Sequence, residues 1–307
     1  MGLATREAYG KALLQLGADN NNVVVLDADL SKSTKTGDFA AKFSDRFINV
    51  GIAEQNLMGI AAGLASYGKT PFASTFAVFA TGRAFEIIRN SICYPNLNVK
   101  IAATHAGISV GEDGGSHQSV EDIALMNALP NMTVIVPADA RETEEVIKYA
   151  AAHDGPVYIR LGRLAAEDIF DDSYTYEFGK GVELTDGNDV AIIATGLMTH
   201  QAKIAAEELK AHGISARVIH IPTIKPIDRN IIAKAAKETK FIVTCEEHSV
   251  IGGLGSVVAS VTAELHPTKV VKIGLNDVFG ESGTPAELLK KYGMTAENVI
   301  KVVRENM

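Results

Sequence analysis

Cysteine is scarce in this sequence, because only Cys93 and Cys245 occur among its 307 residues. The two cysteines lie far apart, and neither belongs to a Cys-x-x-Cys pair. This pattern argues against a disulfide framework and against a zinc site built on cysteine. We expect both thiols to be reduced and to lie in hydrophobic cores.

Positive charge and long apolar runs are also in short supply. The chain has 29 Lys and Arg against 37 Asp and Glu, a net charge of −8, so it lacks the electrostatic footprint of a protein that binds nucleic acid or an anionic membrane. No uninterrupted apolar run approaches the roughly 20 residues that span a bilayer, and the first residues lack the apolar core of a secretory signal. We therefore expect a cytoplasmic protein with neither nucleic acid nor a membrane as its partner.

Short β-branched runs alternate with helical patterns along the chain, which is typical of parallel sheets flanked by helices. A helix with one apolar face is expected over residues 5–17, ending at Gly17, and an amphipathic helix within residues 138–153. The first half predicts six strands of one sheet, at residues 23–28, 46–51, 70–75, 98–104, 132–138 and 156–161.

The alternation of strands and helices resumes in the second half. Apolar runs predict strands at residues 189–195, 216–221, 240–247 and 269–275. Between the two halves, acidic and aromatic residues follow no clear period, which indicates a linker. The fold class is therefore α/β with two domains, each a mostly parallel β-sheet flanked by helices, over residues 1–165 and 186–307, with the linker at 166–185.

A glycine-rich turn, IGGLGS at residues 251–256, precedes a predicted helix of the second domain. Such a turn could cradle a phosphate at the helix N-terminus. It lacks the G-x-G-x-x-G spacing, however, so close packing of helix against strand is the preferred explanation for its glycines.

Polar residues gather where strands of the first domain are expected to end. Ligands of an open parallel sheet collect beyond the carboxyl ends of its strands. Glu54, which follows the strand at 46–51, opens a helix, and an isolated acid there is usually just a favourable charge at a helix N-terminus. Its neighbours at comparable strand ends favour a binding site instead: Asp27, Asp29, Ser74, Thr75, His105, Arg160 and Arg163.

Five segments resemble, in order and at compatible spacing, the thiamine diphosphate enzymes of the transketolase family. The resemblance spans nearly the whole chain and covers the family's pyrimidine-binding and C-terminal domains. Five segments together are far more specific than one. They are GIAEQN (51–56), TFAVFATGRAF (75–85), THAGISVGEDGGSHQS (104–119), LPNMTVIVPAD (129–139) and CEEHSVIGGLGS (245–256).

The resemblance implies thiamine diphosphate as cofactor and gives Glu54 a chemical role. In the family, a carboxyl group acts on N1′ of the pyrimidine and favours the imino tautomer of the 4′-amino group, which removes the thiazolium C2 proton. Phe76 and Phe79 match the aromatic pocket around the aminopyrimidine, and Asp29 is expected near the cofactor. Ordinary core packing is the alternative for the two phenylalanines, and a loop cap for Asp29.

The resemblance also implies a site for sugar phosphates. Arg6 and Ser33 match phosphate-binding positions, and Arg163, with Arg160 beside it, would complete the cationic end. His105 and His117 match substrate-facing histidines that assist proton transfers, and Asp113 the residue that reads the hydroxyl next to the donor carbonyl. Each has a structural alternative: Arg6 solvated near a helix start, arginines paired with Glu167 or Asp168, and histidines that are simply hydrogen-bonded.

The family's GDG motif, which with a downstream asparagine holds the divalent metal and the diphosphate, does not occur in the sequence. The nearest approaches are EDGGSH at 112–117 and TDGND at 185–189. The resemblance therefore implies a split enzyme in an α2β2 assembly. A partner N-terminal subunit with the GDG motif would supply the Mg²⁺ ligands, and no metal ligand is expected in this chain.

Subfamily features point in two directions. Glu54 lies in Ala-Glu-Gln, which departs from the Arg-Glu-His of full-length transketolases and is similar to the deoxyxylulose-phosphate synthases. Arg6, Ser33, His105 and Arg163 favour transketolase. We therefore predict the C-terminal subunit of a transketolase of the pentose phosphate type, which moves a two-carbon ketol unit from a ketose phosphate to an aldose phosphate. The alternatives are a synthase-like enzyme, the β subunit of a 2-oxo acid dehydrogenase and a non-catalytic binding module.

Overall fold

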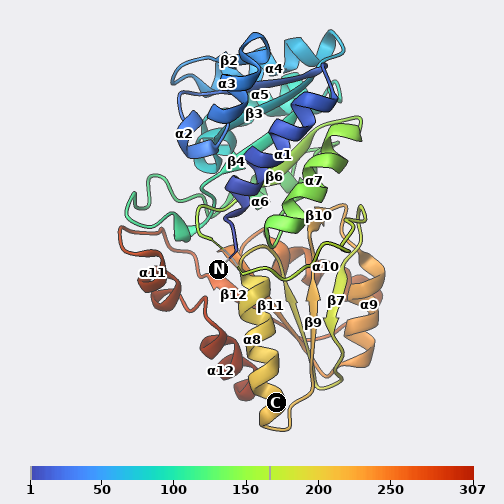
Figure 1. Cartoon of the computed structure of the whole chain (residues 1–307). Helices are drawn as coiled ribbons and strands as arrows, with labels where there is room; N and C mark the ends of the chain where they lie inside the picture. Colours follow the sequence, from blue (N-terminus) through green and yellow to red (C-terminus); the bar gives the residue numbers. More distant parts are fainter. Residues whose placement is uncertain (1, 166) are drawn as a thin grey trace.

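The computed structural model describes residues 2–165 and 167–307. The chain folds into two α/β domains, each built on one central sheet with helices on its faces (Figure 1). This arrangement confirms the predicted fold class. The N-terminus lies where the two domains meet, and the C-terminus lies at the far end of the second domain.

The first sheet has seven strands in the order β10-β5-β6-β4-β3-β1-β2. All six strands predicted for it form, and they pair in parallel. The seventh, β10, was not predicted; it comes from the second half of the chain and pairs antiparallel with β5. The strands are β1 (Val23–Asp27), β2 (Phe47–Asn49), β3 (Thr70–Phe76), β4 (Lys100–Thr104), β5 (Thr133–Ile135), β6 (Val157–Arg160) and β10 (Thr223–Lys225).

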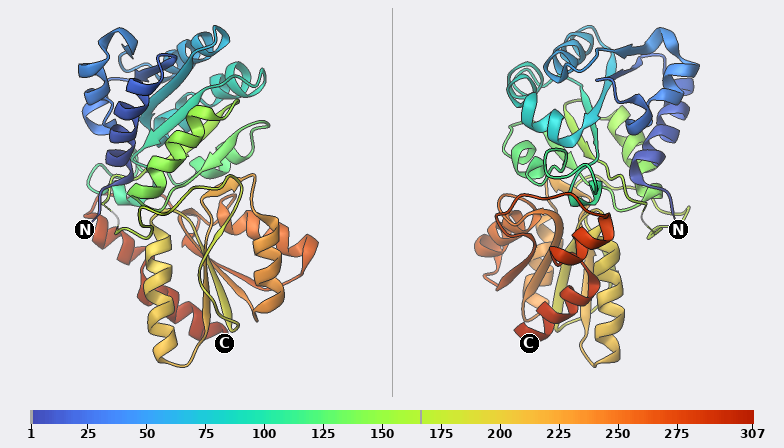
Figure 2. Two further views of the ribbon diagram at one scale, coloured as in Figure 1. Left: turned by 45° about the vertical axis from the view of Figure 1, so that its right-hand side comes forward. Right: turned by 90° about the vertical axis from the view of Figure 1, so that its left-hand side faces the viewer.

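Helices cover both faces of this sheet. α1 packs with α7 on one face, and α4 packs on the other (Figure 2). α1 continues past its expected end at Gly17 to Asp19. This glycine serves close packing and does not end the helix, because a Cβ on it would lie 2.5 Å from Phe39 and 2.8 Å from Phe43. The helices are α1 (Thr5–Asp19), α2 (Ser31–Thr34), α3 (Gly37–Lys42), α4 (Glu54–Ser66), α5 (Phe85–Ile87), α6 (Asp122–Asn127) and α7 (Ala140–Ala152).

The second sheet has five strands in the order β12-β11-β8-β9-β7. Its edge strand β7 (Val182–Thr185) is antiparallel to β9 and lies inside the segment expected to be a linker. The other strands are β8 (Val190–Ala194), β9 (Ala216–His220), β11 (Ile242–Ser249) and β12 (Val270–Leu275). The helices are α8 (Met198–Ala211), α9 (Arg229–Glu238), α10 (Leu254–Leu265), α11 (Pro285–Lys291) and α12 (Ala296–Asn306).

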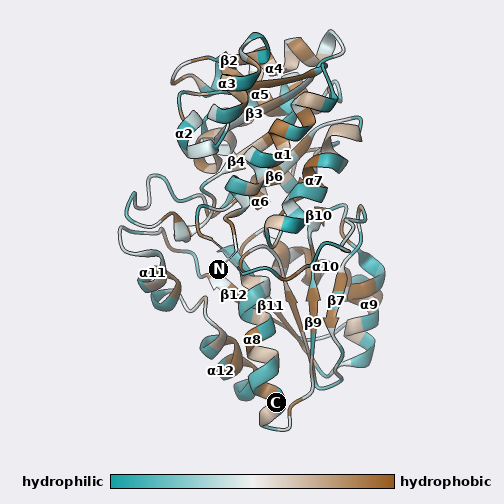
Figure 3. Cartoon of the chain, viewed as in Figure 1, coloured by the Kyte–Doolittle hydropathy of each residue, from teal (hydrophilic) through white to brown (hydrophobic). Residues whose placement is uncertain are grey.

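One hydrophobic core runs through both domains. Side chains from α4 and the first sheet belong to the same buried cluster as side chains from β9, α9 and α10. Figure 3 shows the strands of the second sheet as hydrophobic and the outer faces of the helices as more hydrophilic. Both cysteines are free and buried, as predicted. In the part of the chain that the structure describes, no helix is both long and apolar enough to cross a membrane.

The glycine-rich turn at residues 251–256 binds a carboxylate of the same chain. The buried Glu246 carboxylate accepts hydrogen bonds from the backbone N–H groups of Leu254 (2.6 Å) and Gly255 (2.8 Å), at the start of α10. A Cβ on Gly253 would collide with this carboxylate, and one on Gly255 would lie 2.7 Å from Thr244 Oγ1. The glycines therefore serve close packing, and the helix N-terminus has no room for a phosphate.

Candidate active site

Glu54 is held at the carboxyl edge of the first sheet by a sharp turn. Gly51, with φ of +74°, turns the chain from β2 toward α4, whose first residue is Glu54. The Glu54 side chain is only 2% exposed, and its Oε2 lies 2.9 Å from Nη1 of Arg83. Residue Glu54 also lines a surface hollow together with Ile52, Ala53, Gln55, Asn56 and Arg83. The acid is thus buried and ion-paired, yet borders a space that a ligand can reach.

The two predicted aromatic residues lie side by side. Phe76 ends β3, and Phe79 begins a short π-helical segment, Phe79–Arg83. Their rings are 5.9 Å apart and nearly parallel, with an angle of 8° between them. The guanidinium carbon of Arg83 lies 4.8 Å from the centre of the Phe79 ring, so one arginine contacts both the aromatic pair and Glu54.

Both predicted histidines join the aromatic pair. The His105 ring stacks on Phe76 at 3.8 Å. The His117 ring stands edge-on to Phe79 at 5.4 Å and to Phe76 at 6.3 Å. Residues from four separate segments therefore form one contiguous cluster at the carboxyl ends of the strands. This is the edge where the sequence pattern predicted a ligand site.

His105 is held as a neutral imidazole. Its Nδ1 lies 2.9 Å from Thr104 Oγ1, and its Nε2 lies 3.3 Å from Arg6 Nη1, which can only donate. Burial, followed by the positive charges of Arg6 and Arg163, lowers the pKa of His105 from 6.5 to about 3. Nε2 therefore accepts the hydrogen bond from Arg6, and the ring proton sits on Nδ1.

Arg6 connects this cluster to the loop after β1. Its Nη1 donates to the carbonyl oxygen of Ser33 at 3.0 Å, and burial lowers its pKa. The loop itself is ordered by buried Asp27, which accepts bonds from Leu30 N, Thr34 Oγ1 and Thr36 Oγ1 at 2.6–2.9 Å. The exposed side chain of Asp29 instead accepts from Asn49 Nδ2 at 3.1 Å.

Arg163 reaches the loop that carries Asp113 and His117. Its Nη1 donates to the carbonyl oxygen of Val110, and it lies 3.4 Å from Glu112 and 3.9 Å from Asp113. These partners differ from Glu167 and Asp168, the acids considered from the sequence. About a third of the Arg163 side chain remains exposed (36%), so it still faces solvent beside the cluster.

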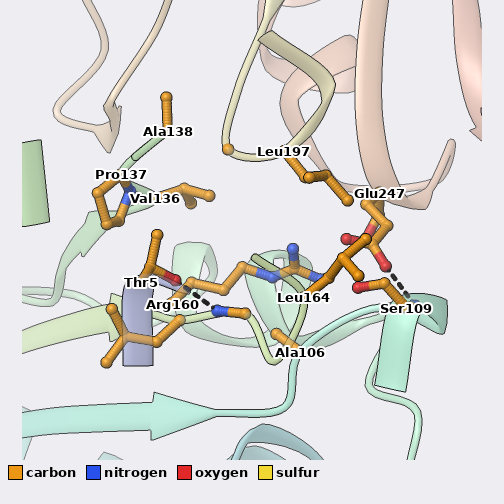
Figure 4. Close-up of a pocket in the computed structure, with 13 residues that line it drawn as sticks. Thr5, Ala106, Ser109, Val136, Pro137, Ala138, Arg160, Leu164, Leu197 and Glu247 are labelled. Atoms are coloured by element: carbon orange, nitrogen blue, oxygen red, sulfur yellow. Dashed lines mark hydrogen bonds between the residues drawn. The ribbon is translucent and has the colours of Figure 1, made fainter. Parts of the chain in front are cut away.

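Arg160 requires a correction, because its guanidinium is committed to other groups of the protein. It is buried, forms an ion pair with Asp122 (Nε to Oδ2, 2.8 Å) and donates from Nη2 to the carbonyl oxygens of Glu247 at 2.9 Å and Ser119 at 3.3 Å. It also borders a small cavity of about 30 Å³ between the domains (Figure 4). That space is enough for about one water molecule. We therefore remove Arg160 from the predicted phosphate site.

Two residues of the site were not singled out from the sequence. Arg83 lies within the matched segment TFAVFATGRAF, four residues after Phe79, so its position in that segment was an available signal. Gln118 follows His117 directly, and its role depends on a contact with the second domain, which no local pattern encodes.

Comparison with known proteins identifies the families of both domains. Residues 1–167 match the transketolase pyrimidine-binding domain, and residues 179–299 match the transketolase C-terminal domain. A putative transketolase C-terminal section from Methanocaldococcus jannaschii is 54% identical, covering 98% of this chain and 96% of its own length. Human transketolase is 38% identical over 98% of this chain and 49% of its own length.

A solved structure is also closely similar. A split-gene transketolase, described as an inactive β4 tetramer, has a TM-score of 0.93 and 61% identity and covers 99% of this chain and 98% of its own. These relatives are transketolases, which favours the prediction of a transketolase over the alternative of a 2-oxo acid dehydrogenase β subunit. The chain belongs to the transketolase family, in which it corresponds to the section that carries the pyrimidine-binding and C-terminal domains.

Proposed function

We propose that this chain is the C-terminal subunit of a split, thiamine diphosphate-dependent transketolase of the cytoplasm. It would transfer a two-carbon ketol unit from a ketose phosphate to an aldose phosphate. The observation that carries this proposal is the contiguous cluster at the sheet edge. There, the ion-paired carboxyl of Glu54, the Phe76–Phe79 pair and the two histidines meet.

The residues of this cluster fit the aminopyrimidine of the cofactor. Glu54 offers a buried carboxylate beside a hollow, and Phe79 offers a ring face against which a flat group already rests, the guanidinium of Arg83. In this proposal Glu54 holds a proton at the pyrimidine ring nitrogen, and its burial keeps water from competing for that proton. When bound, thiamine diphosphate supplies the carbon nucleophile that accepts the ketol unit.

The diphosphate and Mg²⁺ are assigned to a partner subunit. The split-gene relative supports a second polypeptide, and this chain matches only 49% of the length of human transketolase. In the described residues, no group of three or more His, Cys, Asp and Glu side chains could hold a metal ion. We propose that an N-terminal subunit with the GDG motif supplies the metal ligands, in an α2β2 assembly.

The other residues near the cluster would bind the sugar substrate. A donor hydroxyl would take the place of Arg6 as the hydrogen-bond donor to Nε2 of neutral His105. His117, whose ring stands edge-on to Phe79, would assist proton transfer. Asp113 would select the stereochemistry next to the donor carbonyl. Arg6, Ser33 and Arg163 would bind the sugar phosphate, since guanidinium groups can contact two phosphate oxygens at once. Asp29 remains a weaker candidate for cofactor contact.

The decisive experiment reconstitutes the chain with its partner subunit and measures ketol transfer. Glu54→Ala is expected to remove turnover while leaving the thermal midpoint of the chain nearly unchanged, because its partner Arg83 is 51% exposed and the change leaves no buried charge uncompensated. Glu86→Ala, which removes an exposed acid from α5, is the matched control. Full turnover by Glu54→Ala would refute the proposed role of this residue.

A further inference from the structure

The loop that carries Asp113 and His117 is packed against the second domain. This loop, residues 111–118, follows the short helical turn Ile108–Val110. Facing it is loop 278–284, which leads from β12 to α11, and α11 contacts the turn at 108–110 (Figure 1). Two segments that are far apart in the sequence therefore lie side by side beside the candidate active site.

Glycines bring the two backbones into direct contact. A Cβ on Gly115 would lie 2.7 Å from the carbonyl oxygen of Gly280, and a Cβ on Gly114 would lie 2.5 Å from Ser282 Oγ. A Cβ on Gly280 would in turn collide with Gln118 Oε1. Real Cβ atoms do not approach other atoms this closely. An added methyl group on Gly115 meets backbone and must push the loops apart, whereas one on Gly280 must displace the side chain of Gln118.

Gln118 ties the two loops together next to His117. Its side chain is buried, and Nε2 lies 2.9 Å from the carbonyl oxygen of Glu281 in the second domain. The same nitrogen lies 3.2 Å from the carbonyl oxygen of Gly111 and 3.3 Å from that of Ile108. The side-chain amide of Gln118 thus joins both ends of loop 111–118 to the C-terminal domain.

Support from outside the loop matters because its backbone is rich in glycine. Gly111 and Gly114 adopt positive φ angles of +87° and +76°, and glycine-rich backbone has high conformational freedom when unsupported. The polar partner of His117 in the described residues is its neighbour Ser116, at 2.9 Å. From the first domain, Arg163 holds the other side of the loop through Val110 and Glu112.

We propose that loop 278–284 of the C-terminal domain is a positioning element for ketol transfer. It presses on loop 111–118 and thereby holds Asp113 and His117 toward the donor sugar. The C-terminal domain then contributes to catalysis without touching the substrate. This inference rests on the proposed function, because it assumes that Asp113 and His117 face the donor.

The test separates the two loops from both sides. Gly115→Ala and Gly280→Ala would be assayed in the complex reconstituted with the partner subunit, with Ser260→Thr, which adds a methyl group at an exposed site of α10, as the control. We expect kcat/KM for the ketose phosphate donor to fall by about tenfold or more, since a displacement of about 1 Å can cost up to about 100-fold. Calorimetric affinity for thiamine diphosphate should fall much less than kcat/KM, because Glu54 and Phe79 lie on other elements and this loop contacts the aromatic pair through His117.

The outcomes discriminate between the proposals. Wild-type kcat/KM in both glycine variants overturns the positioning role, and so does an equal loss of cofactor affinity, which would indicate general unfolding. If a glycine variant does not fold, Gln118→Met decides, because it keeps the volume but removes the bridging amide; an unchanged kcat/KM again overturns the role. If Glu54→Ala loses turnover while the glycine variants keep it, the positioning role alone is refuted. If Glu54→Ala stays active, the role of Glu54 on which the proposed function rests is refuted.

Discussion

At the scale of single residues, His105 shows how surroundings set chemistry. Its pKa is lowered from 6.5 to about 3, first by burial and then by the nearby guanidinium groups. Between these two values the unfolded chain binds a proton at this position and the folded chain does not. The stability that depends on neutral His105 is therefore complete above pH 6.5 and is lost as the pH falls toward 3.

We expect His105→Gln to remove this pH dependence. The difference in unfolding free energy between wild type and variant should shrink by up to about 1.4 kcal/mol per pH unit as the pH falls below the ordinary histidine pKa. Urea unfolding followed by circular dichroism at a series of mildly acidic pH values measures this difference. A difference that stays constant with pH would show that His105 is protonated as easily in the folded chain as in the unfolded one.

Arg160, the last residue of β6, and Arg163, three residues later, have different roles although they are close in sequence. Arg160 is buried and paired with Asp122, whereas Arg163 is partly exposed beside the cluster. Removing one partner of a buried ion pair leaves an uncompensated charge and costs about 3–5 kcal/mol, while an exposed pair contributes about 0–1 kcal/mol.

We therefore expect opposite effects from the two alanine variants. Arg160→Ala should lower the thermal midpoint strongly, as read by calorimetry, while Arg163→Ala should leave it nearly unchanged. In the reconstituted complex, Arg163→Ala should chiefly raise KM for phosphorylated sugars. If Arg163→Ala left KM unaltered, this residue would not belong to the phosphate site.

At the scale of elements, the strands with continuous β-branched runs were predictable. β1 is buried along its whole length, and the run of Val and Leu in it is typical of a central parallel strand. β10 was missed because it has only three residues and lies between Pro222 and Pro226, where no period can be read. β7 was assigned to a linker because the acidic and aromatic residues of that segment follow no clear period.

The helix starts show the same limit. The glycine-rich turn before α10 left two explanations open, a phosphate cradle or close packing. The choice was made by Glu246, a residue of β11 whose carboxylate occupies the N-terminus of that helix. Nothing in the local sequence of a helix indicates that a neighbouring strand will supply its cap.

At the scale of the whole molecule, the two domains are interlocked. β10 leaves the second half of the chain to extend the first sheet, and one hydrophobic cluster includes side chains from both domains. Arg160 adds a buried hydrogen bond from the first domain to Glu247 of the second. The domains are therefore expected to depend on each other for stability.

A truncated chain tests this dependence. Residues 1–185 alone should aggregate or unfold, because the edge of β5 and the hydrophobic face that packs on the second domain would become exposed. Size-exclusion chromatography with circular dichroism provides the measurement, and the full chain is the reference. A folded, monodisperse fragment would show that the first domain needs neither β10 nor the shared core.

The sequence by itself determined the α/β class, the two domains and the set of residues placed at the strand ends, because periodicity and strand-to-helix order are local properties of the chain. Only the tertiary structure decided which of these residues meet. In it, His105 stacks on Phe76, Arg83 pairs with Glu54, and Arg160 forms a buried ion pair with Asp122. It also placed loop 278–284 against the loop of His117. Such contacts depend on how distant elements pack, and packing is set by the complementary shapes of many side chains at once.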